Sequence, residues 1–369
     1  MKIGILGAGQ LAQMLALAGI PLGCRFVFYD PTPDCCAAAL GKHVQEDYDN
    51  WQALQAFAES VDIVTFEFEN VPVETVNFIE KHGTVYPKAN SLGATQDRLF
   101  EKQLFARLGI PTAKFIDITS RADLEQAADS LGYPLLLKSR TGGYDGKGQI
   151  MLESQQQLDS AWLEINGQPF IAEKWVSFSR EVSIIAARSQ NGGCEFYDLV
   201  ENQHHQGILR TSFNRPDDPL STKAQEYIQT LMNELDYCGV LTLELFQVGD
   251  QLVVNEFAPR VHNSGHWTIE GAVVSQFENH LRAILNLPLG ATTHVAYSAM
   301  INFISQIPPV NELLSVPGSH YHQYGKQPKP GRKLGHLTIC ADLPETLESL
   351  SDQVNSKILP LNHSGLDLA

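Results

Sequence analysis

Strand-like and helix-like segments alternate over the first part of the chain, and this alternation restricts the possible folds more than any other feature. The run KIGIL is followed by a glycine-containing turn, a helix-like segment and a second strand-like segment at 25–29. A β-rich run at 62–71, a helix-like segment ending at Gly83 and a short strand at 84–87 extend the pattern. Alternating β and α units predict an open, mostly parallel sheet, which we assign to a first domain over residues 1–92.

The pattern changes after this domain. A chain of 369 residues exceeds one typical domain of about 100–200 residues, so two or three domains are expected. Residues 93–290 mix helices with short strands whose loop lengths fit antiparallel pairing, and they include a predicted helix at 121–131. Within this region, residues 112–176 form a predicted subdomain around a glycine-rich loop. Residues 291–369 carry three Pro-rich interruptions and predict a small β-rich C-terminal domain, so the fold class combines α/β with α+β.

Charge and cysteine usage exclude several classes of protein. The 26 basic and 42 acidic residues give a net charge of −16, and no run of Lys or Arg exceeds two. These features argue against nucleic acid or an anionic membrane as a partner, although a small anionic substrate needs only a local cluster of positive charge. The six cysteines lack metal-binding spacing, and no window offers about 18 uninterrupted apolar residues. We therefore expect a cytoplasmic protein.

The segment GAGQLA at 7–12 matches the G-x-G-x-x-G/A fingerprint of dinucleotide-binding domains. It lies between a predicted strand and a predicted helix, and Asp30 stands at the end of the second strand, where an acid that binds ribose is expected. Taken alone, the segment suggests NAD. The same glycines also suit any tight strand-to-helix turn with an anion at the helix N-terminus.

The stretch KSRTGGYDGKGQ at 138–149 contains four glycines among the seven residues 142–148. It is not a P-loop, because Lys147 is followed by glycine and the stretch lies between two β-rich runs. We interpret it as the tip of a hairpin that folds over phosphates, with Lys138 on the incoming strand as an added positive charge. The alternative is a mobile surface hairpin.

The segment GVLTLELFQVGDQLVVNEFAPR predicts a second hairpin, with its turn at 249–251. A three-residue turn places Glu244 opposite Glu256, where two like charges about 5 Å apart are destabilising. A divalent cation would reverse this effect, and Mg²⁺ favours a few carboxylate oxygens together with phosphates and water. The alternative is two solvated glutamates on an exposed face, which the apolar neighbours make less favourable.

A further candidate is AEKWVSFSREVSIIAAR at 172–188. Glu173 and the residues after it fit a hinge between strands in which backbone groups of residues 174–176 bind the adenine edge. Glu181, on the next strand, could accept hydrogen bonds from ribose hydroxyls. Glu173 could equally be a surface acid at the end of a strand.

These features together resemble the ATP-grasp superfamily, with its Rossmann-like pre-ATP-grasp domain. The motifs RTGGYDGKGQ, ENQHHQGILRTS, NEFAPRVHNSGHWT and PGRKLGH are similar to those of the N5-carboxyaminoimidazole ribonucleotide synthetases. The resemblance implies that ATP and bicarbonate give carboxyphosphate and ADP, and that 5-aminoimidazole ribonucleotide then takes up the carboxyl group with release of phosphate. It also implies a role in purine biosynthesis, a need for Mg²⁺ and a homodimer.

The resemblance also implies roles for individual residues. Those implied to bind ATP are Arg98, Lys138, Gly143, Tyr144, Asp145, Gly146, Lys147, Gly148, Gln149, Glu173, Lys174, Trp175, Val176, Glu181, His204, Asn255 and Glu256. Those implied to border the ribonucleotide or the carboxyl donor are Glu67 or Glu69, Tyr144, Arg260, His262, Asn263, Lys326, Arg332 and Lys333. Those implied to act in catalysis are Asp145, Arg260, Lys326 and Arg332, and those implied to hold Mg²⁺ are Glu244 and Glu256.

Three other functions remain open on the sequence. The chain could be an ATP-grasp carboxylate–amine ligase with a different acceptor, or a nucleotide-binding regulatory protein without turnover. The glycine fingerprint at 7–12 leaves an NAD(P)-dependent oxidoreductase as the third. The inventory of side chains favours phosphoryl transfer, because that reaction needs positioning and charge neutralisation rather than a protein nucleophile.

Overall fold

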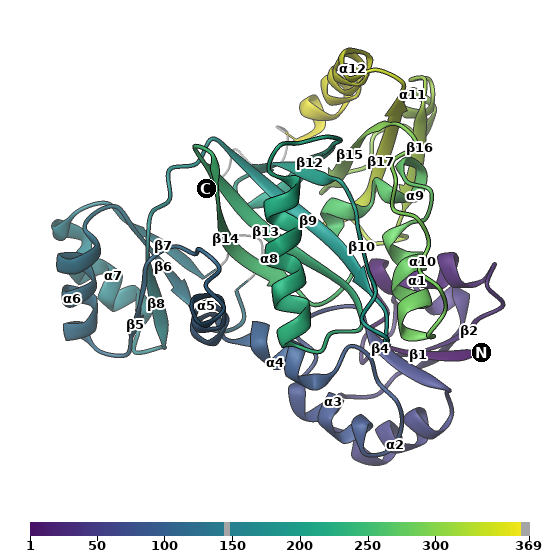
Figure 1. Ribbon diagram of the computed structural model, residues 1–369, viewed down its shortest axis with the longest axis horizontal. Helices are drawn as coiled ribbons and strands as arrows, with labels where there is room; N and C mark the ends of the chain where they lie inside the picture. The colour runs from purple at the N-terminus through teal and green to yellow at the C-terminus, as the bar shows by residue number, and fades with distance from the viewer. Residues whose placement is uncertain (144–147, 363–369) are drawn as a thin grey trace.

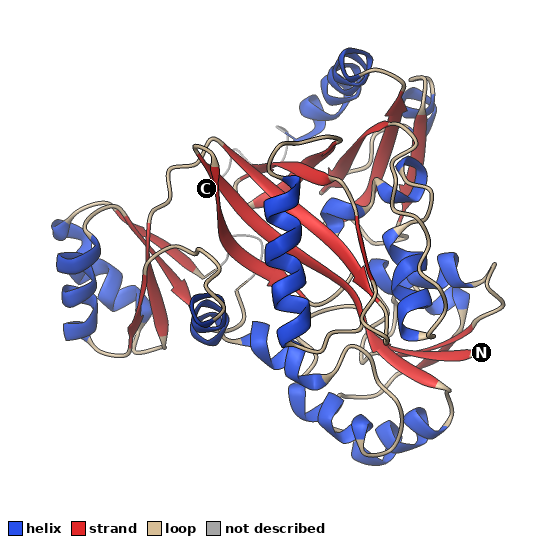
Figure 2. Cartoon of the chain, in the orientation of Figure 1, coloured by secondary structure: helices blue, strands red, loops and turns tan. Residues whose placement is uncertain are grey.

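A computed structural model describes residues 1–143 and 148–362, with side chains described through residue 358 outside that gap. The described chain contains three sheets (Figure 1). A small parallel sheet belongs to the N-terminal unit, a small antiparallel sheet lies to one side, and a large sheet lies between them (Figures 1 and 2). No described helix is long and apolar enough to span a membrane.

The N-terminal unit is the predicted parallel sheet. Its strands run in the order β3-β2-β1-β4, all parallel, because each strand returns through a helix or a loop. The elements are β1 (Lys2–Leu6), α1 (Gln10–Gly19), β2 (Arg25–Tyr29), β3 (Lys42–Val44), α2 (Trp51–Glu59), β4 (Ile63–Phe66), α3 (Val73–Glu80) and α4 (Ala89–Gln96). Two details differ from the prediction. The strand in the run 62–71 ends at Phe66, and the segment 84–87 makes only an isolated bridge between Val85 and Val64.

The antiparallel sheet β5-β8-β6-β7 carries the glycine-rich hairpin. Helix α5 (Arg98–Arg107) leads into it, and its elements are β5 (Phe115–Ile118), α6 (Arg121–Leu131), β6 (Leu135–Ser139), β7 (Gln149–Leu152), α7 (Leu158–Ile165) and β8 (Phe170–Lys174). The prediction for α6 is confirmed at both ends, because Ser120 and Asp123 form a capping box and Gly132 follows the last turn. The two helices bury their apolar faces on one side of the sheet.

The central sheet is covered on both faces. Along β9, Ile184 and Ala186 belong to the core that includes helix α8, whereas Ile185 and Ala187 belong to the core that includes α1 and α10. This alternation follows from the two-residue period of a strand. The elements are β9 (Arg180–Arg188), β10 (Cys194–Phe196), β11 (Leu199–His205), β12 (Ile208–Arg215), α8 (Ser221–Glu234), β13 (Gly239–Val248), β14 (Gln251–Ala258), α9 (Thr268–Gly271) and α10 (Gln276–Ile284).

The C-terminal strands extend this central sheet. Strand β15 pairs with β12, as in Thr211 with Ile301, so the sheet runs β14-β13-β9-β11-β12-β15-β17-β16. The C-terminal elements are β15 (Tyr297–Ile304), α11 (Val310–Leu314), β16 (Ser319–Gln323), β17 (Lys333–Ala341) and α12 (Pro344–Asn362). Their buried side chains share a hydrophobic cluster with Phe213 of β12, in which Leu347 and Val354 of α12 belong with strand residues such as Ile339.

The hairpin of β13 and β14 reaches the predicted register by a different path. Its turn has two residues, Gly249 and Asp250, because Val248 pairs with Gln251. The predicted three-residue turn is therefore wrong. An irregularity next to Glu244 adds one residue to β14, and this extra residue restores the pairing of Glu244 with Glu256.

His280 connects the N-terminal unit with the central sheet. Its Nδ1 accepts a hydrogen bond from the backbone N–H of Val240 at 3.1 Å, so its Nε2 carries the proton and donates to Thr65 Oγ1 at 2.9 Å. Both ring nitrogens are thus used while the ring is neutral. Burial lowers the pKa of His280 to about 4.

We expect His280 to make the protein less stable in acid. The pKa of an unfolded histidine is about 6.5, so at lower pH the unfolded chain binds a proton that the folded chain accepts only near pH 4. The stabilisation is complete above the unfolded pKa, and about 2 kcal/mol of it should be lost between pH 7.5 and 5. Urea unfolding at these two pH values should show a smaller loss for His280→Gln. An equal loss in both proteins would contradict the assignment.

Candidate active site

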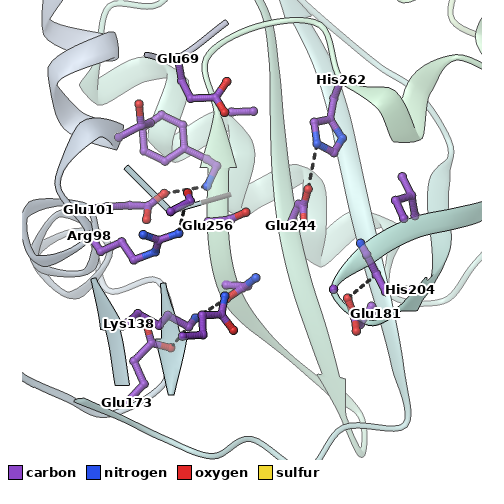
Figure 3. A pocket seen from close by; sticks show the side chains of 18 of the residues that line it. Glu69, Arg98, Glu101, Lys138, Glu173, Glu181, His204, Glu244, Glu256 and His262 are labelled. Carbon is purple, nitrogen blue, oxygen red and sulfur yellow. Dashed lines mark hydrogen bonds and ion pairs between the residues drawn. The ribbon is translucent and has the colours of Figure 1, made fainter. Parts of the chain in front are cut away.

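The site is a cavity of about 570 Å³ where the three sheets meet (Figure 3). Each unit contributes charged side chains to its lining, among them Glu69 from the N-terminal unit, Lys138 from the antiparallel sheet, Glu244 from the central sheet and Lys333 from β17. The cavity therefore exists only when all three units are assembled.

The two predicted acids, Glu244 and Glu256, line this cavity and face each other across β13 and β14, as predicted. Burial and the nearby charge of Glu244 raise the pKa of Glu256. For Glu244, burial acts against ionisation, but His262, His204 and Arg260 lower its pKa to about 2. Its Oε1 lies 2.9 Å from His262 Nε2 (Figure 3). The alternative of two solvated acids on an exposed face is wrong.

These oxygens suit a hard cation. Glu244 and Glu256 supply carboxylates, and the amide oxygen of Asn255 lies between them in the sequence and also lines the cavity. Within the described residues, no group of three or more His, Cys, Asp or Glu side chains could hold a metal ion. Mg²⁺ commonly takes one or two protein carboxylates and completes its shell with substrate phosphates and water, so the residues present fit Mg²⁺.

A third acid, Glu101, was missed by the sequence analysis. It lines the cavity from α5, and its Oε1 accepts the backbone N–H of Phe257 at 2.8 Å, directly after Glu256. Burial, followed by the charge of Glu256, raises the pKa of Glu101 to about 8. The signal was available, because Glu101 lies three residues after Arg98 and such residues share one helix face.

The glycine-rich stretch is the tip of the hairpin β6–β7, as predicted. Arg98 binds the β6 side of this tip, since its Nη1 donates to Ser139 O at 2.8 Å and its Nη2 to Gly143 O at 3.1 Å. Gly148 has φ +71°, and a Cβ there would lie 2.5 Å from Ser139 Oγ, so the turn requires glycine. The predicted ligands Tyr144, Asp145, Gly146 and Lys147 lie outside the described residues.

Lys138 and Glu173 form an ion pair at the wall of the cavity. Lys138 Nζ lies 3.0 Å from Glu173 Oε2 and 3.2 Å from Asn255 Oδ1 (Figure 3). Glu173 is only 3% exposed, so the alternative of a surface acid at the end of a strand is wrong. A second cation, Lys102, lies 3.4 Å from Glu173 Oε1. Burial acts against ionisation of Glu173, but the two lysines keep its pKa below the ordinary value.

The predicted hinge lines the same cavity next to apolar side chains. Residues 174–176 share the lining of this cavity with Phe178 and Phe246, whose rings stack with centroids 4.6 Å apart and planes 11° apart. No sequence motif indicates this pair, because its two members are distant in the chain. Glu181 Oε2 lies 2.8 Å from His204 Nδ1, and that contact, together with Glu244, raises the pKa of His204 against the effect of burial (Figure 3).

The motif NEFAPRVHNSGHWT continues the site toward the N-terminal unit. Arg260 donates from Nε to Glu69, and it keeps the pKa of Glu69 below the ordinary value although burial acts in the opposite direction. The ring of His262 contacts the carboxylate of Glu244. The side-chain amides of Asn263 and the buried Asn302 each donate a hydrogen bond to the other. Arg260, His262 and Asn263 all line the cavity.

Glu67 occupies the helix N-terminus that the glycine fingerprint suggested for a dinucleotide. It accepts the backbone N–H groups of Gly9 and Ala12, and Asp30 accepts the N–H of Ala8 at 3.0 Å. A Cβ on Gly9 would lie 2.6 Å from Glu67 Oε1, so this glycine admits a carboxylate of the protein itself. The N–H groups that would bind a pyrophosphate are therefore already used, which argues against an NAD site here.

The three predicted C-terminal cations divide between two places. Lys333 lines the cavity described above, whereas Lys326 and Arg332 are not among its described lining residues. Lys326 donates to Gln10, which does line the cavity, so it lies at the margin. Arg332 donates to Gln327 O at 3.3 Å.

The fold and the site together define an ATP-grasp enzyme. Family models match three successive parts of the chain: a ribonucleotide synthetase preATP-grasp domain at residues 1–96, an ATP-grasp domain at 103–277 and a phosphoribosylaminoimidazole carboxylase C-terminal domain at 298–350.

Similar proteins show which family of ATP-grasp enzymes this chain belongs to. The chain is 52% identical to an N5-carboxyaminoimidazole ribonucleotide synthase of Pseudomonas aeruginosa, over 93% of this chain and 95% of the relative. It is similar to the crystal structure of the synthetase from Thermus thermophilus, with a TM-score of 0.93 and 46% identity over 100% of both chains. A structure from Aspergillus clavatus in complex with ADP and 5-aminoimidazole ribonucleotide has a TM-score of 0.87 and 30% identity, covering 96% of this chain and 98% of that one. The chain belongs to the N5-carboxyaminoimidazole ribonucleotide synthase family, and it is an ATP-dependent ligase of purine biosynthesis.

Proposed function

We propose that this ligase joins bicarbonate to the exocyclic amine of 5-aminoimidazole ribonucleotide and uses Mg²⁺ with ATP. One observation carries the proposal. The paired acids Glu244 and Glu256 line the same cavity as Lys138 and Arg98, which lie next to the tip of a glycine-rich hairpin. Cations and a metal-binding pair of acids around one cavity suit a triphosphate, whose charge must be neutralised from several sides.

The proposed reaction has two steps, phosphorylation of bicarbonate and transfer of the carboxyl group to the amine. A bicarbonate oxygen attacks the γ-phosphorus of ATP, so that a P–O bond forms, the bond to the β-phosphate oxygen breaks, and carboxyphosphate and ADP result. The amine nitrogen then attacks the carboxyl carbon, phosphate leaves, and the amine loses a proton. Carboxyphosphate is labile in water, so a hairpin that closes over the phosphates would protect it.

Different side chains contact different parts of the nucleotide and the metal ion. Lys138 and Arg98 bind phosphates, Glu181 binds ribose, and the backbone of residues 174–176 binds adenine beside the stacked pair Phe178 and Phe246. Glu244 and Glu256, with Asn255, would hold Mg²⁺, which supplies charge neutralisation at the phosphates when it is bound. Lys138 contacts Glu173 and Asn255, so a phosphate in the cavity would compete with these two groups for its ammonium.

The acceptor lies between the N-terminal unit and β17. Glu69, Arg260, His262 and Asn263 face the cavity on that side, and Lys333 closes it. We assign the carboxyl donor and the amine to this group and the ribonucleotide phosphate to the cations Lys326 and Arg332 at the margin. Glu67 positions the turn at the start of α1, because its carboxylate accepts the backbone N–H groups of Gly9 and Ala12.

The test measures products with the purified protein, ATP and Mg²⁺. We expect ADP and phosphate in equal amounts only when both bicarbonate and 5-aminoimidazole ribonucleotide are present. Bicarbonate labelled with ¹⁸O should transfer one labelled oxygen to each released phosphate, because the P–O bond formed in the first step survives the second. ADP formation with formate or an amino acid in place of bicarbonate would contradict the proposal, and so would unlabelled phosphate.

We also propose a homodimer, as the resemblance implies. The mass of one chain is 40.8 kDa. Sedimentation equilibrium should give twice this value, and a single-chain mass at micromolar concentration would contradict the proposal.

A further inference from the structure

The carboxylate of Glu173 lies between two lysines that come from different elements, α5 and β6. Lys138 Nζ lies 3.0 Å from Oε2, and Lys102 Nζ lies 3.4 Å from Oε1. The side chains of Lys102, Lys138 and Glu173 are 1%, 7% and 5% exposed. Two cations thus share one buried anion, although one cation would be sufficient to neutralise it.

The two lysines differ in what else holds them. Lys102 belongs to α5, and its Nζ donates to Thr112 Oγ1 at 3.1 Å and to the backbone carbonyl of Asn255 at 2.7 Å. Its contact with Glu173 Oε1 at 3.4 Å is an ion pair, so two hydrogen bonds and one ion pair hold Lys102. Lys138 belongs to β6, lines the cavity and has a side-chain amide, Asn255 Oδ1, as its other partner. Lys102 is therefore fixed, whereas Lys138 can turn toward the cavity.

A buried carboxylate is costly without a cation, because desolvation is no longer offset by a nearby opposite charge. If Lys138 were the only partner of Glu173, each move of Lys138 to a phosphate would leave that carboxylate unpaired. The cost of the unpaired carboxylate would then cancel most of the binding free energy that the contact between Lys138 and the phosphate supplies. The second lysine removes this conflict.

We propose that Lys102 is the permanent counterion of Glu173 and that it allows Lys138 to exchange its contact with Glu173 for a contact with the triphosphate. Lys102 is in this sense a positioning residue, since it acts on the nucleotide through Lys138. The inference rests on the proposed function, in which Lys138 binds a phosphate of ATP.

The decisive comparison is between Lys102→Met and the double variant Lys102→Met/Glu173→Gln. In the single variant Lys138 is the sole partner of Glu173, so we expect the Kd of a non-hydrolysable ATP analogue, measured by calorimetry with Mg²⁺, to rise about 10-fold or more. In the double variant the competing charge is absent, so we expect its Kd to lie within about threefold of the Kd of Glu173→Gln alone. A residue that only stabilises the fold would show no such rescue.

Two further variants separate the possible causes of failure. Lys138→Met should raise the Kd about 10-fold or more, and an unchanged Kd would overturn the proposed role of Lys138 in ATP binding. If Lys138→Met weakens binding while Lys102→Met binds as wild type, only the inference about Lys102 fails. Gln103→Ala, on the exposed side of α5, is the matched control and should bind as wild type.

The double variant also tests the inference by itself. Replacing a buried ion pair by neutral groups is far less costly than breaking it, so this protein should fold even where Lys102→Met alone does not. Urea unfolding reports this directly. A folded double variant that binds the ATP analogue more than about 10-fold more weakly than Glu173→Gln alone would overturn the proposal.

Discussion

Glu256→Gln should lower kcat at least about 100-fold and should leave the fold intact, because it removes the charge that a bound Mg²⁺ needs and preserves the size of the side chain. Glu256 faces Glu244 across the hairpin, and burial and this neighbouring charge both raise its pKa. Without the metal, the negative charge of Glu256 is therefore unfavourable for folding. Its removal should make the metal-free protein equally stable or more stable.

The measurement combines two readouts of this variant. Turnover is followed over a range of Mg²⁺ concentrations, and stability is followed by urea unfolding in the presence of a chelator. Asp250→Asn is the matched control, since Asp250 is an exposed acid in the turn of the same hairpin. Near-normal turnover of Glu256→Gln at limiting Mg²⁺ would refute the metal assignment. A marked loss of stability without metal would show that Glu256 is a structural acid.

The sequence predicted those parts of the fold that depend on local signals. The helix at 121–131 begins at a capping box and is followed by a glycine, and both signals are readable in the residues themselves. The parallel N-terminal sheet follows from the alternation of strands and helices. The facing of Glu244 and Glu256 was also predicted, but the predicted turn was one residue too long, and a β-bulge made up the difference.

The parts that the sequence did not predict depend on contacts between distant segments. Lys102 belongs to none of the motifs in the sequence, and its partner Glu173 is 71 residues away in the chain. Phe178 and Phe246 likewise meet only because β13 pairs with β9. No local pattern indicated that β15 would join the central sheet through β12. Pairing of this kind is decided by burial across whole units rather than by neighbouring residues.

The polar face of α5 explains how the units remain in register around the cavity. Arg98 binds the glycine-rich hairpin, Glu101 binds the backbone of β14, and Lys102 binds both β8 and β14 through Glu173 and Asn255. One helix therefore fixes the distance between the side of the cavity proposed for the phosphates and the side proposed for Mg²⁺. A shift of about 1 Å between these sides would be costly for catalysis, because phosphoryl transfer depends on alignment of the reacting groups.

Arg260→Met should lower kcat/KM for 5-aminoimidazole ribonucleotide at least about 100-fold, while the KM for ATP changes less than about threefold, because Arg260 lies on the acceptor side of the cavity. Arg260 donates to Glu69 and keeps the pKa of this acid below the ordinary value, so the variant also leaves a buried carboxylate unpaired. Two effects are thus combined, a loss of stability and a loss of substrate binding.

The double variant Arg260→Met/Glu69→Gln separates these two effects. Removal of the unpaired charge should restore most of the stability to urea, because a neutral pair avoids the cost of an isolated buried ion. It should not restore kcat/KM, since a guanidinium that contacts the acceptor or the carboxyl donor is still missing. Arg260→Lys should give an intermediate value, because an ammonium keeps the charge but lacks the planar fork of donors. Recovery of both stability and kcat/KM in the double variant would show that Arg260 serves only to hold Glu69, and its assignment to the acceptor site would then be wrong.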